Sequence, residues 1–133
     1  TDIGDVAGLA VSSTQIAWIA VGSDASDPQR VRTIPIDGGV ATEAAADTNI
    51  GIGIVSDGDS FFWGTSTADS VEVIALAPDG TTKVAGSDAV PGDAVAVGAF
   101  YLALDATRVW SLAWAYIDNP SGAPQSLLSN AAR

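Results

Sequence analysis

The sequence predicts an all-β protein that repeats one small antiparallel unit three times. Glycines recur with a period of about 42 residues at two positions of the unit, which are Gly8, Gly51 and Gly92 at one and Gly39, Gly80 and Gly122 at the other. Self-similarity with a period of roughly 20–50 residues is the sequence signature of repeat architectures. Apolar residues alternate with a period of two between clusters of glycine, aspartate and serine, which indicates strands rather than helices.

Four strands are expected in each unit, in the same order. The first strand begins at or near the first glycine, at residues 8–11, 51–54 and 92–95. Small polar or glycine-containing turns are expected next, at residues 12–15, 56–60 and 96–99. The second strand carries an aromatic residue in each unit and is expected at residues 16–19, 61–63 and 100–102.

The third strand is the longest of each unit and is expected at residues 30–36, 70–76 and 109–117. A weaker fourth strand is expected at residues 40–45, 81–85 and 125–129. Both faces of the strand at 109–117 are apolar, with Val109 and Ala113 on one face and Trp110 and Trp114 on the other. A sheet open to water on one side would carry polar residues there, so this pattern predicts a sheet covered on both faces.

Four short strands in a repeat of about 42 residues are typical of a β-propeller blade. We therefore predict three four-stranded blades, at residues 5–47, 48–88 and 89–133 approximately. A single-chain β-sandwich made from the same short strands is the alternative.

Two stretches of the first unit resemble a known family. Residues 10–18 (AVSSTQIAW) and 30–39 (RVRTIPIDGG) are similar to the YWTD-like and TolB-like six-bladed propeller repeats of bacteria. The second unit keeps Phe62-Trp63, whereas the third has Tyr101-Leu102 at that place. The tetrad that names the family is absent in strict form. The resemblance implies a ring of blades and leaves the activity open.

Three blades do not close a ring, and an open ring exposes the apolar faces of its end blades. The sequence therefore predicts that other blades cover these faces. They would come from a second copy, as a two-fold symmetric homodimer, or from further blades of a longer parent chain.

The charge balance restricts the partners. Sixteen acidic residues, fourteen of them Asp, stand against five basic ones, and the net charge is −11. Binding to nucleic acid or anionic lipid depends mainly on Lys and Arg, so neither is expected as a partner. Membrane insertion is not expected either, because no apolar run reaches about 20 residues.

The residue types that are missing restrict the chemistry and the compartment. The sequence has no Cys and no His, which excludes thiol nucleophiles, disulfides, Cys/His zinc sites and histidine bases. A serine nucleophile would depend on Lys83, the one lysine, as its base. The lack of cysteine, the many aspartates and the start at Thr1 favour a processed extracytoplasmic or secreted protein.

Asp57 and Asp59 flank Gly58 and are the candidate metal ligands. Carboxylate oxygens suit a hard cation, so calcium is the cofactor that this pair would take, although the spacing does not match an EF-hand loop. The alternative is a hairpin turn in which Asp and Gly only provide turn geometry. No other cofactor is expected.

Trp110, Trp63 and Arg108 are the candidate ligand-binding residues. Tryptophan rings stack on sugars, and arginine clamps anionic groups with two parallel hydrogen bonds. The alternative is that the tryptophans pack between blades and the arginines pair with aspartates at the rim.

The function expected from these features is a noncatalytic binding or assembly module that associates with itself and binds a glycan or a protein. A hydrolase with paired carboxylates in the propeller funnel is one alternative, for which the sequence identifies no catalytic residue. An extracellular filament subunit is another, because a head-to-tail contact that fails to close grows without limit.

Overall fold

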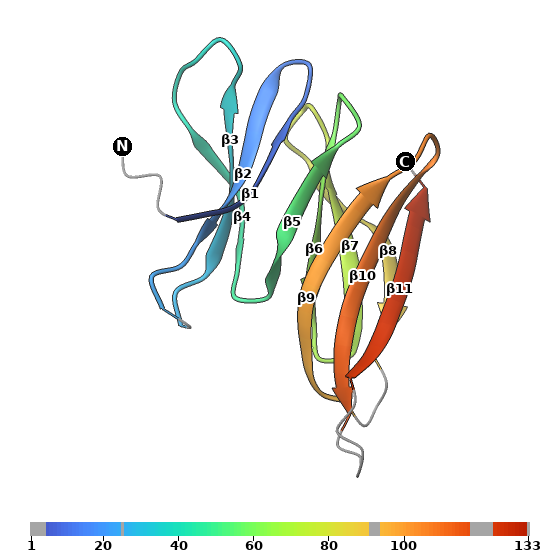
Figure 1. Cartoon of the computed structure of the whole chain (residues 1–133). Coiled ribbons are helices and arrows are strands. Elements are labelled where there is room, and N and C mark those ends of the chain that lie inside the picture. Colours follow the sequence, from blue (N-terminus) through green and yellow to red (C-terminus); the bar gives the residue numbers. More distant parts are fainter. Residues whose placement is uncertain (1–4, 25, 91–93, 118–123, 133) are drawn as a thin grey trace.

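The computed structural model consists of strands joined by turns, and its described residues include no helix that could span a bilayer (Figure 1). It describes the backbone of residues 5–24, 26–90, 94–117 and 124–132, and the side chains of residues 5–24, 26–90 and 102–110. Within that part of the chain, eleven strands form three separate antiparallel sheets. The predicted all-β fold class is confirmed.

Each sheet is a meander in which strands consecutive in sequence pair with one another. Sheet 1 contains β1 (Asp5–Val11), β2 (Gln15–Val21), β3 (Gln29–Pro35) and β4 (Thr42–Asp47). Sheet 2 contains β5 (Ile50–Ser56), β6 (Phe61–Ser66), β7 (Ser70–Leu76) and β8 (Thr82–Ala89). Sheet 3 contains β9 (Ala94–Leu104), β10 (Arg108–Ile117) and β11 (Pro124–Ala132).

Sheet 3 corrects one part of the sequence prediction. The strands expected at 92–95 and 100–102 are not separated by a turn at 96–99, because β9 runs through that segment. Sheet 3 therefore has three strands among the described residues, where four were expected. Residues 96–99 (AVGA) offer no Asp, Asn, Ser or Pro to favour a turn.

A β-bulge takes the place of that turn. The register pairs Leu112 with Tyr101 and then Trp114 with Gly98, so two residues of β9 stand opposite one residue of β10. An extra residue of this kind bends the strand and increases its twist without ending it. The expected break in the pattern is therefore a local distortion of one long strand.

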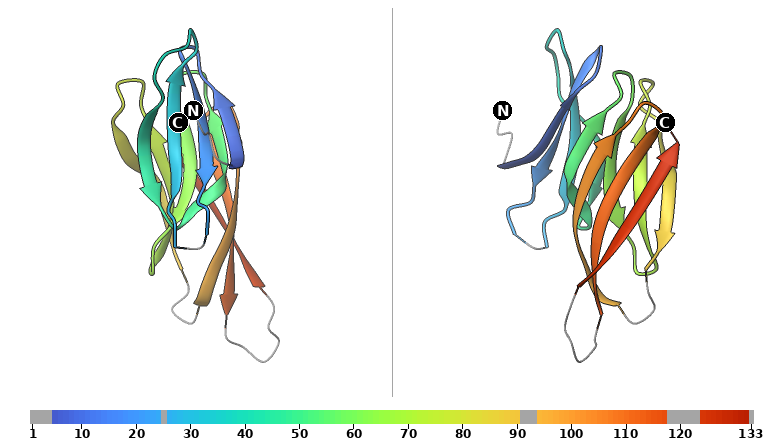
Figure 2. Two further views of the ribbon diagram at one scale, coloured as in Figure 1. Left: turned by 90° about the vertical axis from the view of Figure 1, so that its left-hand side faces the viewer. Right: turned by 45° about the vertical axis from the view of Figure 1, so that its right-hand side comes forward.

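Sheet 2 lies between sheets 1 and 3, and the first strands of the three sheets, β1, β5 and β9, lie side by side (Figures 1 and 2). This is the arrangement of neighbouring propeller blades, whose innermost strands approach one another. The three sheets do not close into a ring.

The side chains of β6 point alternately to the two neighbouring sheets. Phe61 and Trp63 join a buried cluster with Ala17, Ile19 and Val31 of sheet 1. The residue between them, Phe62, joins a second buried cluster on the opposite face of sheet 2.

The second cluster connects sheet 2 to sheet 3. In it, Phe62 and Val73 lie with Val109 of β10, and Leu104 of β9 packs against them. Burial of each large apolar side chain stabilises the fold by about 1.5–3 kcal/mol, so both faces of sheet 2 contribute to the core. The strand expected to be covered on both faces, 109–117, lies in sheet 3, where Val109 packs against sheet 2 and the side chains of residues 111–117 lie outside the described part.

The glycine that opens the first unit allows β1 and β5 to approach closely. A Cβ atom on Gly8 would lie 2.6 Å from the carbonyl oxygen of Ile52 and 3.3 Å from Cγ2 of Ile54. Real Cβ atoms essentially never come this close to a backbone oxygen. Any other residue at position 8 would therefore push the two first strands apart.

We expect G8A to lower the free energy of unfolding by about 1–3 kcal/mol, because overpacking at a backbone contact forces a strand to shift. The exposed neighbour in the same strand gives the control, and A7V should change stability by no more than about 0.5 kcal/mol. Chemical denaturation followed by tryptophan fluorescence measures both. Equal stability of G8A and A7V would contradict the close approach.

Candidate functional site

Side-chain oxygens cap the turn that follows the first strand of each sheet. In sheet 1, the Ser12 N–H donates to the Gln15 carbonyl (2.8 Å), and Ser12 Oγ accepts from the Gln15 N–H (3.0 Å). In sheet 2, the Asp57 N–H donates to the Ser60 carbonyl (3.2 Å), and Asp57 Oδ1 accepts from the Ser60 N–H (2.8 Å). The two turns therefore have the same hydrogen bonds.

The turn between β9 and β10 repeats this pattern with Asp105. Its N–H donates to the Arg108 carbonyl (3.0 Å), and its Oδ1 accepts from the N–H groups of Thr107 (2.7 Å) and Arg108 (2.8 Å). Ser12, Asp57 and Asp105 thus hold equivalent positions. The strands expected at 100–102 and 109–117 leave a loop here, but it was expected after the second strand of the unit, whereas it follows the first strand of sheet 3.

Asp57 and Asp59, the candidate metal ligands, belong to such a turn. Asp57 Oδ1 also accepts from the Asp59 N–H (3.0 Å), and Gly58 between them has a φ of +102° that favours glycine. Within the described part of the chain, no three His, Cys, Asp or Glu residues form a group that could hold a metal ion. The turn interpretation accounts for these contacts, and calcium binding stays a prediction from the sequence.

Trp110 and Arg108, two of the candidate ligand-binding residues, lie together at the β9–β10 turn. The Trp110 Nε1–H donates to Asp105 Oδ2 (2.7 Å), and the guanidinium carbon of Arg108 lies 5.9 Å from the centre of the Trp110 ring. That distance is within the range of a cation–π interaction. Asp105 therefore orients the indole ring, and Arg108 lies over it.

The same contacts change the acidity of Asp105. Hydrogen bonds from the Trp110 side chain first, and then from the N–H groups of Thr107 and Arg108, lower the pKa of Asp105 from 3.8 to about 2. These donors stabilise the charged carboxylate. The turn therefore holds a carboxylate that stays ionised at any ordinary pH.

Trp63, the third candidate, lies elsewhere. It is 2% exposed and packs in the core between sheets 1 and 2. In this position its ring presents no open face to a ligand. The packing role given above as the alternative is therefore the one that the structure shows for Trp63.

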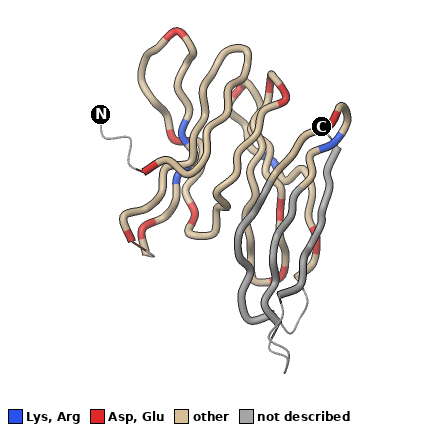
Figure 3. Tube along the Cα trace, in the orientation of Figure 1, with Lys and Arg blue, Asp and Glu red and all other residues tan. Residues whose placement is uncertain are grey.

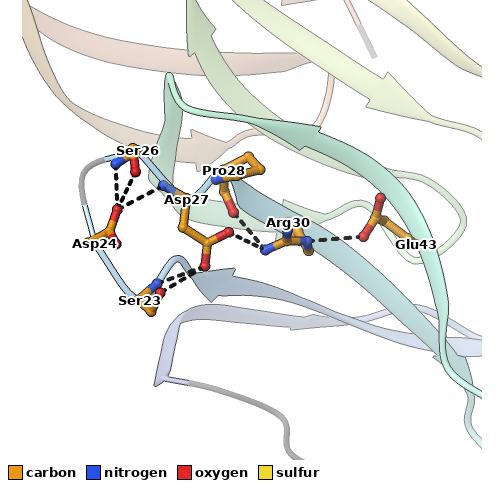
Figure 4. A network of polar contacts seen from close by, with 7 residues as sticks. All are labelled: Ser23, Asp24, Ser26, Asp27, Pro28, Arg30 and Glu43. Carbon is orange, nitrogen blue, oxygen red and sulfur yellow. Dashed lines mark hydrogen bonds and ion pairs between the residues drawn. The ribbon is translucent and has the colours of Figure 1, made fainter.

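Arg30 of sheet 1 forms ion pairs with two neighbouring acidic residues. Its Nη1 donates to Asp27 Oδ1 (3.1 Å) and to the Pro28 carbonyl (3.0 Å), and its Nε lies 3.3 Å from Glu43 Oε2 (Figure 4). The side chains of Arg30, Asp27 and Glu43 are partly solvent-exposed, so these ion pairs contribute little to stability. The expected pairing of arginine with aspartate is present for Arg30.

The carboxylates with shifted pKa values all show the same direction. Hydrogen bonds from Ser26 lower the pKa of Asp24, the Ser23 N–H lowers that of Asp27, and the Thr81 hydroxyl lowers that of Asp79. A carboxylic acid that protonates a leaving group requires the opposite shift. These aspartates are suited to capping turns, and Figure 3 shows acidic residues mainly at turns and strand ends.

A cavity of about 330 Å³ lies against the face of sheet 2 that is turned to sheet 3. Phe62 and Ala75 form its apolar wall, and Asp57, Ser60 and Lys83 are among its polar residues. No hydrogen bond joins Ser60 to Lys83 in the described part of the chain, so this pair shows no activated nucleophile.

One face of sheet 1 is covered by no other sheet of the described chain. On it, Val6, Leu9 and Val11 of β1 are 43%, 61% and 49% exposed. The register pairs Val11 with Ile16 and Ile16 with Ile34, and directly paired residues share a face. Together with Trp18 and Arg32, these residues make up what we call the open face.

The open face of sheet 1 has a buried counterpart in sheet 2. Leu9, Trp18 and Arg32 pair across sheet 1 just as Ile54, Trp63 and Ile74 pair across sheet 2. By the same register, Ile16 and Ile34 correspond to Phe61 and Leu76.

The sheet 2 residues on this face are buried against sheet 1. Ile54, Phe61, Trp63 and Leu76 are 6%, 1%, 2% and 3% exposed. The open face therefore has the residue pattern of a sheet–sheet interface without a neighbouring sheet on it.

Solved structures include chains of similar fold, although the sequence itself finds no relative. No protein-family model and no curated protein matches this sequence. The crystal structure of TolB from Acinetobacter baumannii, a β-propeller protein, matches 93% of this chain with a TM-score of 0.50 and 10% sequence identity. The fold is loosely TolB-like. The match covers 32% of the TolB chain, so this chain spans about a third of its length.

We expect W110F to raise the pKa of Asp105 from about 2 towards 3.8, because the indole N–H is the strongest of its stabilising contacts. Carbon-detected NMR titration of the aspartate carboxyls measures this shift. Asp79, which Thr81 caps, should titrate unchanged in the same spectra.

The sign of the effect on stability follows from the lowered pKa. Asp105 contributes stability above its unfolded pKa, and this contribution is lost as the pH falls through about 2. W110F should reduce that loss. If Asp105 titrates at the same pH in both proteins, the Trp110 hydrogen bond is not the cause.

Proposed function

We propose that this chain is a noncatalytic assembly and binding module whose open face docks a second copy of the chain. Two copies, each with three sheets, would then complete a six-bladed propeller. The open face carries the proposal, because its counterpart in sheet 2 already forms a sheet–sheet interface within the chain. The open face of each copy would contact sheet 3 of the other copy. These two equivalent contacts give a closed ring with two-fold symmetry.

The exposed apolar area supplies the driving force. On the open face, Leu9 is more than half exposed and Val11 is about half exposed. Val6 of the same strand is also exposed. Burial of apolar surface contributes about 25 cal/mol per Å². A contiguous apolar patch on a sheet face commonly marks a protein interaction site.

The resemblance of the repeats supports the size of the ring. Residues 10–18 and 30–39 are similar to the repeats of YWTD-like and TolB-like propellers, which have six blades. Three sheets are half of a six-bladed ring.

Ligand binding belongs to the same proposal. Of the residues expected to bind a glycan or a protein, Trp110 and Arg108 are the pair that lies together outside the core. We propose them as the ligand-binding residues of this chain, with Asp105 holding the indole in place. The location outside the cytoplasm is proposed on composition alone.

We expect the chain to sediment at twice its 13.3 kDa mass and L9D to sediment as a single chain. The substitution places a charge in the apolar contact, where it would be buried without a partner. V40D is the matched control, because Val40 is 83% exposed and lies outside the open face.

Sedimentation velocity at several concentrations distinguishes the outcomes. A wild-type chain that stays single at every concentration would contradict the proposal. Growth beyond two copies would contradict ring closure and support the filament alternative.

A further inference from the structure

In the middle of the sheet, the open face differs from its buried counterpart at one position. Arg32 stands where sheet 2 has Ile74, and its cross-strand partner is Trp18, as that of Ile74 is Trp63. The four other pairs named above, Leu9/Ile54, Trp18/Trp63, Ile16/Phe61 and Ile34/Leu76, are apolar in both sheets, whereas at the sheet end Val11 stands where sheet 2 has Ser56. An arginine in the middle of an apolar face is costly to bury unless its guanidinium finds an acceptor.

Arg32 has no such acceptor within the described chain. The two ion pairs of the described residues both belong to Arg30, which lies two residues earlier on the same face of β3. Glu43, the register partner of Arg32, is 3.3 Å from the Arg30 Nε. The carboxylate that stands opposite Arg32 in the register is therefore already paired with the other arginine, and Arg32 remains partly exposed.

Trp18 adds a second observation beside Arg32. It is 8% exposed, and its Nε1–H has no hydrogen-bond partner in the described part of the chain. Buried indole N–H groups are normally paired. Because the chain itself covers Trp18 Nε1, a docked surface would contact the partly exposed Arg32 rather than the indole nitrogen.

We infer that Arg32 is the specificity-determining residue of the open face and donates to an oxygen acceptor of the docked second copy. This inference rests on the proposed function. The second copy suits the role because a chain with sixteen acidic and five basic residues is rich in acceptors. An arginine paired in this way also disfavours wrong apolar partners, which would leave its charge buried alone.

Because sheet 2 has Ile74 at the place of Arg32, the substitution R32I tests the role of Arg32 by whether self-association becomes weaker or stronger. If Arg32 binds an acceptor of the docked copy, R32I should weaken self-association roughly tenfold or more, because the acceptor is left buried and unpaired. If Arg32 is only a charge on an apolar face, R32I should strengthen association, because it reproduces the chemistry of the sheet 2 interface. R32K should fall between wild type and R32I if the planar guanidinium is needed.

K83I is the matched control. Lys83 is an exposed cation on β8, so its loss changes the net charge as R32I does without touching the open face. Its dissociation constant should stay within about twofold of wild type.

Sedimentation equilibrium measures the four proteins at low and high salt and between pH 7 and pH 4. Weakening of wild-type association at low pH, absent in R32I, identifies a carboxylate acceptor, whereas weakening by R32I at every pH identifies a neutral carbonyl. R32I that associates as tightly as wild type, or more tightly, overturns the inference and leaves the proposed function standing. A wild-type chain that does not associate, judged together with L9D, overturns the proposed function itself.

Discussion

Face-to-face packing of apolar sheets is the constraint on which the rest of the structure depends. β6 places Phe61 and Trp63 against sheet 1 and Phe62 against sheet 3, so sheet 2 is stable only between two neighbours. A sheet with two apolar faces cannot end the stack by itself. The open face of sheet 1 follows directly from this requirement, because it repeats the pattern of a face that is buried one sheet further along.

The strong negative charge has a local explanation in the turns. Asp57 and Asp105 accept backbone N–H groups at equivalent turns, and Asp24 and Asp79 do the same at others. Short antiparallel strands require many turns, and aspartate caps a turn at little steric cost. The acidic composition is therefore largely a consequence of the architecture, and the lowered pKa values of Asp24, Asp79 and Asp105 agree with this role.

Strand positions and faces were predictable from the sequence because alternation and turn residues are local signals. The strand expected at 70–76 matches β7. The turn expected at 96–99 was wrong because the repeat was extended into a segment whose one turn-favouring residue is Gly98, and β9 continues through a bulge there. The correspondence of Trp18 with Trp63, and of Arg32 with Ile74, depends on the strand register, which the sequence does not specify. Trp63 and Trp110 were both candidate ligand-binding residues, and Trp110 was the better one because it lies beside a loop; Trp63 is buried and Trp110 lies at a turn.

The contact at Gly8 bears on how such a fold diverges. Where the β1 backbone meets the Ile52 carbonyl directly, the distance between neighbouring sheets is set by main-chain atoms rather than by the size of a side chain. Substitutions elsewhere in β1 and β5 then do not change how closely the two strands approach at this point. Copies of the unit are thus free to drift apart in sequence while their spacing is kept, which offers a physical reason why a propeller-like architecture is recognisable at 10% identity.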